Sequence, residues 1–276
     1  FSLFHALLTN RRHAMPFAPF KHFRIEYSVT GRGKGLVLVH GTGQSAENTW
    51  TETARHFSSH YKVVCPNYSG TGKTQDNNEE LTVELLGDQV LAAADHARLR
   101  RFDIVGHSLG TCVAVYLAAN HPERIGKVLL LAGFASTGDA RSQLQFRMWK
   151  EMAETNPELL AQTFLFTAFS PAFVAALTDC AVRKTVRDIF ATTDWKGAVR
   201  QIELDLRVNV TKEARTMMQE TLVLGCTHDY IVPVFHARKL AELIPNARYA
   251  EMETGHGGCV ENPKRFLEIA DGFLKQ

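Results

Sequence analysis

Short apolar segments recur along most of the chain and indicate β-strands. Six of them consist mainly of aliphatic residues and are bounded by glycine, proline or polar residues: 35–40, 61–66, 102–106, 125–131, 221–225 and 247–252. Such runs are typical of strands that are buried on both faces of a parallel sheet.

Helical patterns lie between most of these strands, at 79–99, 111–120, 235–243 and 263–274. Strands that alternate with helices predict an α/β fold with a mostly parallel, doubly wound sheet. An antiparallel hairpin is expected at residues 20–31, on the edge of that sheet.

One segment interrupts the alternation. Residues 134–218 contain no convincing strand and carry many aromatic side chains: Phe146, Trp149, Phe164, Phe166, Phe169, Phe173, Phe190 and Trp195. We expect a helical insertion that lies over one end of the sheet. The predicted organisation is an N-terminal extension at 1–19, a core domain at 20–133 and 219–276, and a helical cap at 134–218.

Composition narrows the class of partner. The 276 residues include 31 basic and 29 acidic side chains, which gives a formal net charge of +2. This excess is too small to indicate a nucleic acid or an anionic membrane as partner. A small-molecule substrate is expected, and assembly into a homodimer is left open.

The cysteines and the N-terminal segment bear on the compartment. There are five cysteines with no C-x-x-C pair, which argues against a disulfide framework or a zinc site and favours a reducing, cytoplasmic environment. The apolar stretch at 1–8 precedes Arg11 and Arg12, the reverse of the order in a secretory signal. No apolar run is long enough to span a membrane, and Met15 could be the natural start.

The strongest local motif is Gly106-His-Ser108-Leu-Gly110, placed between a predicted strand and a predicted helix. Glycines at both ends allow a sharp turn that holds the serine hydroxyl clear of the sheet, at a helix N-terminus. The helix dipole and the free N–H groups favour negative charge there. This context makes Ser108 the candidate nucleophile.

A serine nucleophile needs a base and an orienting acid, which follow it in this chain order in such folds. Asp229 lies in a turn past the strand at 221–225, and His256 lies in a Gly-rich turn past the strand at 247–252. Both turns are expected at the carboxyl edge of the sheet, where open α/β folds place their sites. His228 and Asp103 are the alternatives, and each is better explained as a structural or solvated residue.

The loop after the first core strand reads His40-Gly-Thr42-Gly43-Gln. Its glycines would allow backbone N–H groups to point into the site, with the N–H groups of Thr42 and Leu109 as the two oxyanion donors.

Together, the His40-Gly-Thr-Gly loop, the serine motif, Asp229 and Gly255-His256 resemble the α/β-hydrolase superfamily from about residue 20 onward. The resemblance implies a serine hydrolase with a Ser108–His256–Asp229 triad, no metal or organic cofactor, and a helical cap that forms much of the substrate pocket. Candidate pocket residues are Gly43, His107, Phe134 and Trp149. Relatives with an aspartate nucleophile, the haloalkane dehalogenases and epoxide hydrolases, are disfavoured.

The expected reaction is cleavage of a carboxylic ester, lactone or thioester of an apolar or aromatic small molecule through an acyl-enzyme. Hydrolytic C–C cleavage of a diketone-like ring-cleavage product is an alternative, because the His40-Gly-Thr-Gly loop resembles that of such hydrolases. Lyase or perhydrolase chemistry and a hydrolase-like small-molecule receptor are further alternatives.

Overall fold

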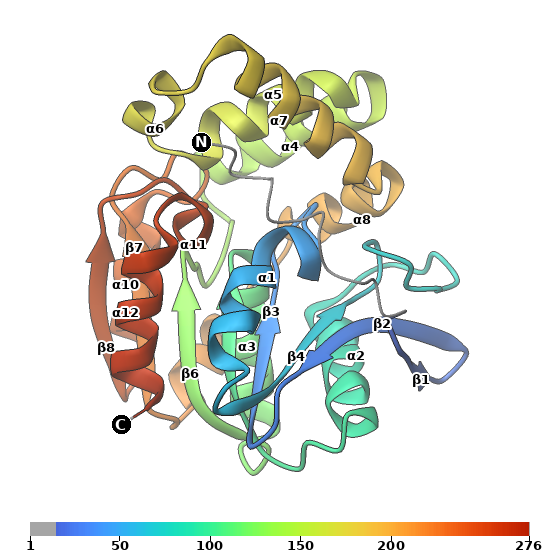
Figure 1. The fold of residues 1–276 in the computed structure, drawn as a ribbon, viewed down its shortest axis with the longest axis vertical. Coiled ribbons are helices and arrows are strands. Elements are labelled where there is room, and N and C mark those ends of the chain that lie inside the picture. The colour runs from blue at the N-terminus through green and yellow to red at the C-terminus, as the bar shows by residue number, and fades with distance from the viewer. Residues whose placement is uncertain (1–14, 276) are drawn as a thin grey trace.

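The computed structural model describes residues 15–275 and contains one sheet of eight strands. The strands are β1 (Phe17–Phe20), β2 (Phe23–Thr30), β3 (Lys34–Val39), β4 (Tyr61–Asn67), β5 (Phe102–His107), β6 (Ile125–Leu131), β7 (Thr221–Cys226) and β8 (Ala247–Met252). They lie in the order β1-β2-β4-β3-β5-β6-β7-β8 (Figure 1). Strands β1 and β2 are antiparallel to their neighbours and the others are parallel. The predicted mostly parallel sheet is therefore confirmed.

The edge hairpin starts earlier than predicted, so the boundary of the extension at 1–19 needs correction. Residues 17–19 belong to β1, where Phe17 pairs with Glu26, while residues 1–14 lie outside the described residues. The hairpin turns at Lys21, whose φ is 51°. Ala18 is buried, which gives the short strand an inward face. The turn lacks the glycine or asparagine that usually signals a tight hairpin.

Helices cover both faces of the sheet. They are α1 (Ala46–Phe57), α2 (Val83–His96), α3 (Leu109–Asn120), α10 (Val234–Leu243), α11 (Gly258–Glu261) and α12 (Pro263–Leu274). Helix α1 was not anticipated; Ser45 caps it by accepting a hydrogen bond from the Asn48 N–H. Helices are expected between most strands, and α1 provides the helix between β3 and β4.

Each core strand contributes to two separate apolar layers. In β3, Leu36 and Leu38 pack on the side of α1 and α12, whereas Val37 and Val39 pack on the side of α2 and α3. Successive side chains point to opposite faces of a strand, so burial on both faces requires an uninterrupted apolar run. This packing explains why the strand signals in the sequence were continuous.

All chain between β6 and β7 is helical or irregular. Its helices are α4 (Ala140–Thr155), α5 (Pro157–Ala168), α6 (Pro171–Ala175), α7 (Asp179–Thr192), α8 (Trp195–Asp205) and α9 (Thr211–Thr216). Helices α4, α5, α6 and α7 lie together beyond the carboxyl ends of the parallel strands (Figure 1). We call α4–α8 the helical insertion. Helix α9 packs against α3 and α10 instead.

The backbone of helix α8 lies in direct contact with the backbone of the loop after β4. A Cβ added to Gly197 would lie 2.2 Å from the carbonyl oxygen of Gly70, in the loop after β4. Only glycine allows the two segments to come so close.

Gly197→Ala should therefore lower the free energy of unfolding by about 1–3 kcal/mol, because the extra methyl group meets backbone that cannot move aside cheaply. The matched control is Gly272→Ala on the exposed side of α12, where an added Cβ meets no atom within 4 Å. That variant should be neutral or more stable by up to about 1 kcal/mol. Urea unfolding of both variants measures the difference, and equal stabilities would contradict the close approach.

Candidate functional site

Ser108 lies in the sharp turn between β5 and α3. Its φ of 54° and ψ of −123° form a backbone conformation that is costly for any residue with a Cβ. Neighbouring segments crowd the turn: a Cβ on Gly106 would lie 2.4 Å from the Gly110 carbonyl oxygen, and a Cβ on Gly110 would lie 2.4 Å from that of Val39. The glycines of the motif thus let the turn form, and Ser108 sits at the N-terminus of α3.

Asp229 and His256 meet at the same edge of the sheet, as expected from their positions after β7 and β8. The Nδ1 atom of His256 donates to Oδ2 of Asp229 at 2.7 Å. The other carboxylate oxygen accepts from the N–H groups of Ile231 and Val232 at 2.8 and 2.7 Å. The carboxylate is therefore fixed by three donors, and it orients His256 so that Nε2 carries the free lone pair.

His107 joins this pair to the serine turn. Its Nε2 atom lies 3.0 Å from the carbonyl oxygen of His256 and its Nδ1 atom lies 2.9 Å from Oε1 of Gln44. Burial lowers the pKa of His107 to about 3, so the ring is neutral at physiological pH and donates to only one of these two oxygens. The Ser108 hydroxyl itself forms no hydrogen bond with any residue in 15–275.

In the loop at 41–44, some backbone N–H groups are hydrogen-bonded within the protein and one is left without a partner among residues 15–275. The Gly41 N–H donates to the side chain of Gln44 at 3.0 Å, and the Gly43 N–H donates to the side chain of Gln201 at 2.9 Å. Within the described part of the chain, the N–H groups of Thr42 and Leu109 have no partner. These are the two donors expected to face an oxyanion.

The four predicted pocket residues lie in different surroundings. Gly43 faces Phe164, whose ring would be 3.5 Å from an added Cβ. Phe134 lines a narrow crevice together with Phe146. Trp149 packs edge-on against both Phe146 and Phe164, with ring centroids 5.4 and 4.8 Å away. His107 lies behind the serine turn, between Gln44 and the His256 backbone.

The two alternative residues lie away from this constellation. Asp103 is buried near the start of β5, where it pairs with Lys34 at 2.6 Å and accepts from the Lys127 N–H at 2.9 Å. His228 is exposed beside Asp229. Neither contacts the serine turn through a hydrogen bond or ion pair.

The helical insertion also holds the His256 loop. Glu261 accepts from the N–H groups of Gly255 and Ser170, each at 2.9 Å, and from the Ser170 hydroxyl at 2.5 Å. In addition, the Gly257 N–H donates to the carbonyl oxygen of Ala168 at 2.7 Å. The segment after α5 is thereby fastened to the loop that carries the candidate base.

Several residues around the site were not found from the sequence: Gln44, Gln201, Asp205 and Glu261. Gln44 ends the His40-Gly-Thr-Gly loop, and the other three belong to no motif. The one available signal is the spacing of Gln201 and Asp205, two polar residues four apart on a helix, which share one face. That spacing alone does not separate a buried polar face from a solvated one.

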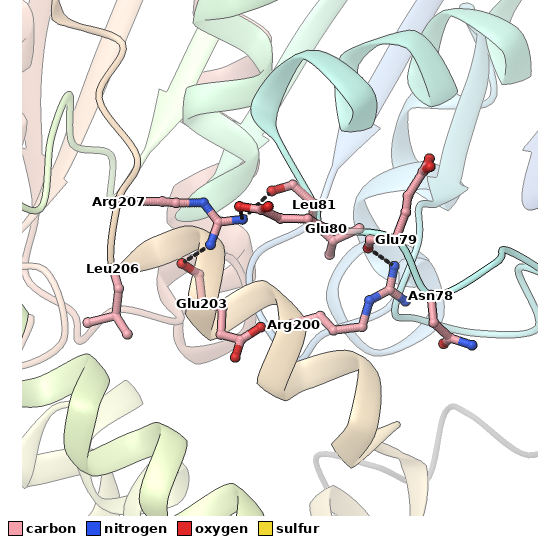
Figure 2. Close-up of a pocket in the computed structure, with 8 residues that line it drawn as sticks. All are labelled: Asn78, Glu79, Glu80, Leu81, Arg200, Glu203, Leu206 and Arg207. Carbon is pink, nitrogen blue, oxygen red and sulfur yellow. Dashed lines mark hydrogen bonds and ion pairs between the residues drawn. The ribbon is translucent and has the colours of Figure 1, made fainter.

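A surface hollow of about 610 Å³ lies elsewhere. Figure 2 shows its lining, which comes from the loop before α2 and from α8 and the residues after it. Its two arginines bind the core: Arg200 pairs with Asp76 at 2.9 Å, and Arg207 pairs with Glu80 at 2.8 Å and donates to the Leu81 carbonyl at 2.7 Å. The ion pairs in this hollow hold α8 against the core, and none of the residues that line it is a candidate catalytic residue.

Among residues 15–275, no three side chains of His, Cys, Asp or Glu are grouped to hold a metal ion. Over the same range, no helix has the length and apolar character needed to cross a membrane.

The strained serine gives a stability prediction. Ser108→Gly should be more stable than Ser108→Ala by about 1 kcal/mol, because strain of this kind costs about 1–3 kcal/mol and glycine relieves it at some cost in chain entropy. Both variants lack the hydroxyl, so the comparison isolates the backbone. Chemical denaturation measures it, and a glycine variant no more stable than the alanine variant would contradict the strain.

The chain is 38% identical over 251 residues to a pyrrolizixenacetamide deacetylase of Xenorhabdus hominickii, which covers 91% of this chain and 94% of the relative. It is 24% identical over 250 residues to a 2-hydroxy-6-oxo-2,4-heptadienoate hydrolase of Pseudomonas putida, covering 88% of this chain and 90% of the relative.

Solved structures of hydrolases also resemble this chain over nearly its whole length. The enol-lactonase from Burkholderia xenovorans LB400 superposes with a TM-score of 0.86 at 26% identity, and the match covers 95% of this chain and all of that one. The family model described as the alpha/beta hydrolase fold matches residues 35–263. The chain is thus a hydrolase that belongs to the alpha/beta hydrolase fold family.

Proposed function

We propose that the protein is a serine-dependent acyl hydrolase that cleaves an ester-type bond of a small apolar or aromatic molecule. The observation that carries the proposal is the Asp229–His256 hydrogen bond, made beside the strained turn of Ser108. In this constellation a buried carboxylate orients an imidazole, and the imidazole serves as base for a serine hydroxyl.

The proposed first step is attack by the Ser108 oxygen on the substrate carbonyl. His256 takes the hydroxyl proton at Nε2, while Asp229 stabilises the resulting imidazolium through Nδ1–H. The oxyanion forms in front of the N–H groups of Thr42 and Leu109, where the positive end of α3 adds to the stabilisation. His256 then returns the proton to the leaving group, which leaves an acyl-enzyme.

The second step reverses these roles. His256 removes a proton from water, the hydroxide attacks the acyl carbonyl, and Ser108 leaves with the proton. The helical insertion serves as the cap in this proposal and supplies apolar lining through Phe146 and Phe164, with Phe134 added from the segment between β6 and α4. A lactone-cleaving enzyme among the similar structures supports the ester-type bond.

Deacetylation of an amide is a second candidate, because the deacetylase relative is 38% identical over nearly the whole chain and its name describes an acetamide. The same triad would attack the acetyl carbonyl, with an amine as leaving group. Hydrolytic C–C cleavage rests on the more distant heptadienoate hydrolase.

A matched substrate pair separates the two leading candidates. p-Nitrophenyl acetate and p-nitroacetanilide carry the same acetyl group on oxygen and on nitrogen. Faster turnover of the ester alone supports the ester-type assignment, and substantial turnover of the anilide supports deacetylation. Labelling of Ser108 without turnover of either compound would favour C–C cleavage or a receptor role.

Substitution of the triad should remove turnover in a graded way. Ser108→Ala should lower kcat below detection, and Asp229→Asn should lower it by about a thousandfold or more because the histidine loses its orientation and favoured tautomer. Intact mass after a fluorophosphonate should show one adduct, absent in Ser108→Ala.

The control for this series is His228→Asn, which changes the exposed neighbour of Asp229 and should retain wild-type kcat. Retained activity in Ser108→Ala, or an adduct mapped to another residue, would remove Ser108 as nucleophile.

A further inference from the structure

Helix α8 of the insertion presents two polar side chains to the candidate oxyanion loop. Gln201 and Asp205 are four residues apart, which places them on the same face of the helix. Both are buried, with Gln201 fully inaccessible and Asp205 1% exposed. Polar groups are this deeply buried only where they have a structural or chemical role.

Gln201 links the oxyanion loop to the loop after β4. Its Oε1 accepts from the Gly43 N–H at 2.9 Å and its Nε2 donates to the carbonyl oxygen of Ser69 at 3.0 Å. Since Gln201 takes up the Gly43 N–H, the adjacent Thr42 N–H is left as the free donor of the loop. The side chain thus selects which amide faces the site.

Asp205 holds the same loop through a side chain. Its Oδ2 accepts from the Thr42 hydroxyl at 2.6 Å, and the Thr137 hydroxyl donates to its backbone carbonyl. The second oxygen, Oδ1, is buried and has no hydrogen-bond partner among residues 15–275. The carboxyl forms no ion pair within that range.

The groups that face Asp205 leave it neutral at physiological pH. Burial raises the pKa of this carboxyl to about 8, and the Thr42 hydrogen bond opposes the rise only in part. Tyr68 from the loop after β4 and Cys112 from α3 are the titratable groups beside it, and burial raises the pKa of both, so both are uncharged. His40, stacked on Tyr68, has a pKa lowered to about 4 by burial and is neutral too.

We propose that Gln201 and Asp205 are positioning residues for the oxyanion hole, and that Asp205 fulfils this role as a neutral carboxylic acid. The inference rests on the proposed function, because it concerns the same reaction. A carboxylate in this position would place a buried negative charge beside the loop that must stabilise a developing negative charge, and the two would repel each other.

The pH profile of kcat/KM for p-nitrophenyl acetate tests the role of Asp205. Wild-type activity should decline above about pH 8, where Asp205 loses its proton, and should fall by about 30-fold at pH 9.5 if the ionised form is inactive. Asp205→Asn keeps an oxygen for the Thr42 hydroxyl and cannot ionise. Its activity should lie within a few-fold of wild type at pH 7 and stay flat to pH 9.5.

The matched control is Glu203→Gln, which makes the same chemical change on the same helix. Glu203 pairs with Lys150 at 2.7 Å, away from the loop. This variant should keep the wild-type alkaline decline. A purely structural role for Asp205 would change stability without moving the profile.

Gln201→Leu tests the positioning of the loop itself. We expect kcat to fall by about tenfold or more with KM little changed, because the loss concerns the transition state. A trifluoromethyl ketone, which forms an oxyanion on the serine, should bind more weakly by a similar factor. The rate of fluorophosphonate labelling should fall in parallel.

Identical alkaline profiles in wild type and Asp205→Asn would overturn the neutral-acid role, and unchanged kcat in Gln201→Leu would overturn the positioning role. In both cases wild-type turnover and labelling at Ser108 remain, so the proposed function stands. A wild-type protein that neither labels at Ser108 nor turns over an ester would overturn both proposals together.

Discussion

The backbone conformation of Ser108 is the constraint on which the rest of the site depends. A residue with a Cβ can be held at this φ and ψ only where the surroundings fix it. Here β5 enters the turn and α3 leaves it. Gly106 lets the end of β5 approach the start of α3, and Gly110 lets α3 approach the end of β3. The strands and helix around the turn are thus packed so closely that the backbone of Ser108 cannot relax to another conformation.

The helical insertion holds the site from two sides. Its α8 contacts the loop at 41–44 through Gln201, and the segment at 168–170 contacts the His256 loop through Glu261. The loops that follow β3 and β8 are therefore connected through the helical insertion as well as through the sheet. Movement of the insertion would alter both sides at once.

Much of the fold followed from local sequence. The continuous apolar strands, the glycines around Ser108 and the turns that carry Asp229 and His256 are all consequences of short-range chemistry, and the structure brings the last two within hydrogen-bond distance. These features could be predicted because strand burial and turn geometry leave a local pattern.

The parts that could not be predicted depend on contacts between distant segments. Asp205 meets Thr42 across 163 positions, and a helix of mixed polarity gives no sign of which polar face is buried. Lys21 adopts a turn without the usual residue, so residues 17–19 of β1 fall within the predicted extension. Trp149 packs edge-on against Phe146 and Phe164, and these pairings between cap helices leave no local sequence pattern.

The cysteines have a practical consequence for studying the insertion. Four of the five are buried, and burial raises the pKa of each of these thiols, which suppresses the reactive thiolate. Cys180 is exposed on α7. The natural sequence thus offers a single accessible attachment point for a spin label or fluorophore, located on the element whose motion relative to the sheet would be of most interest.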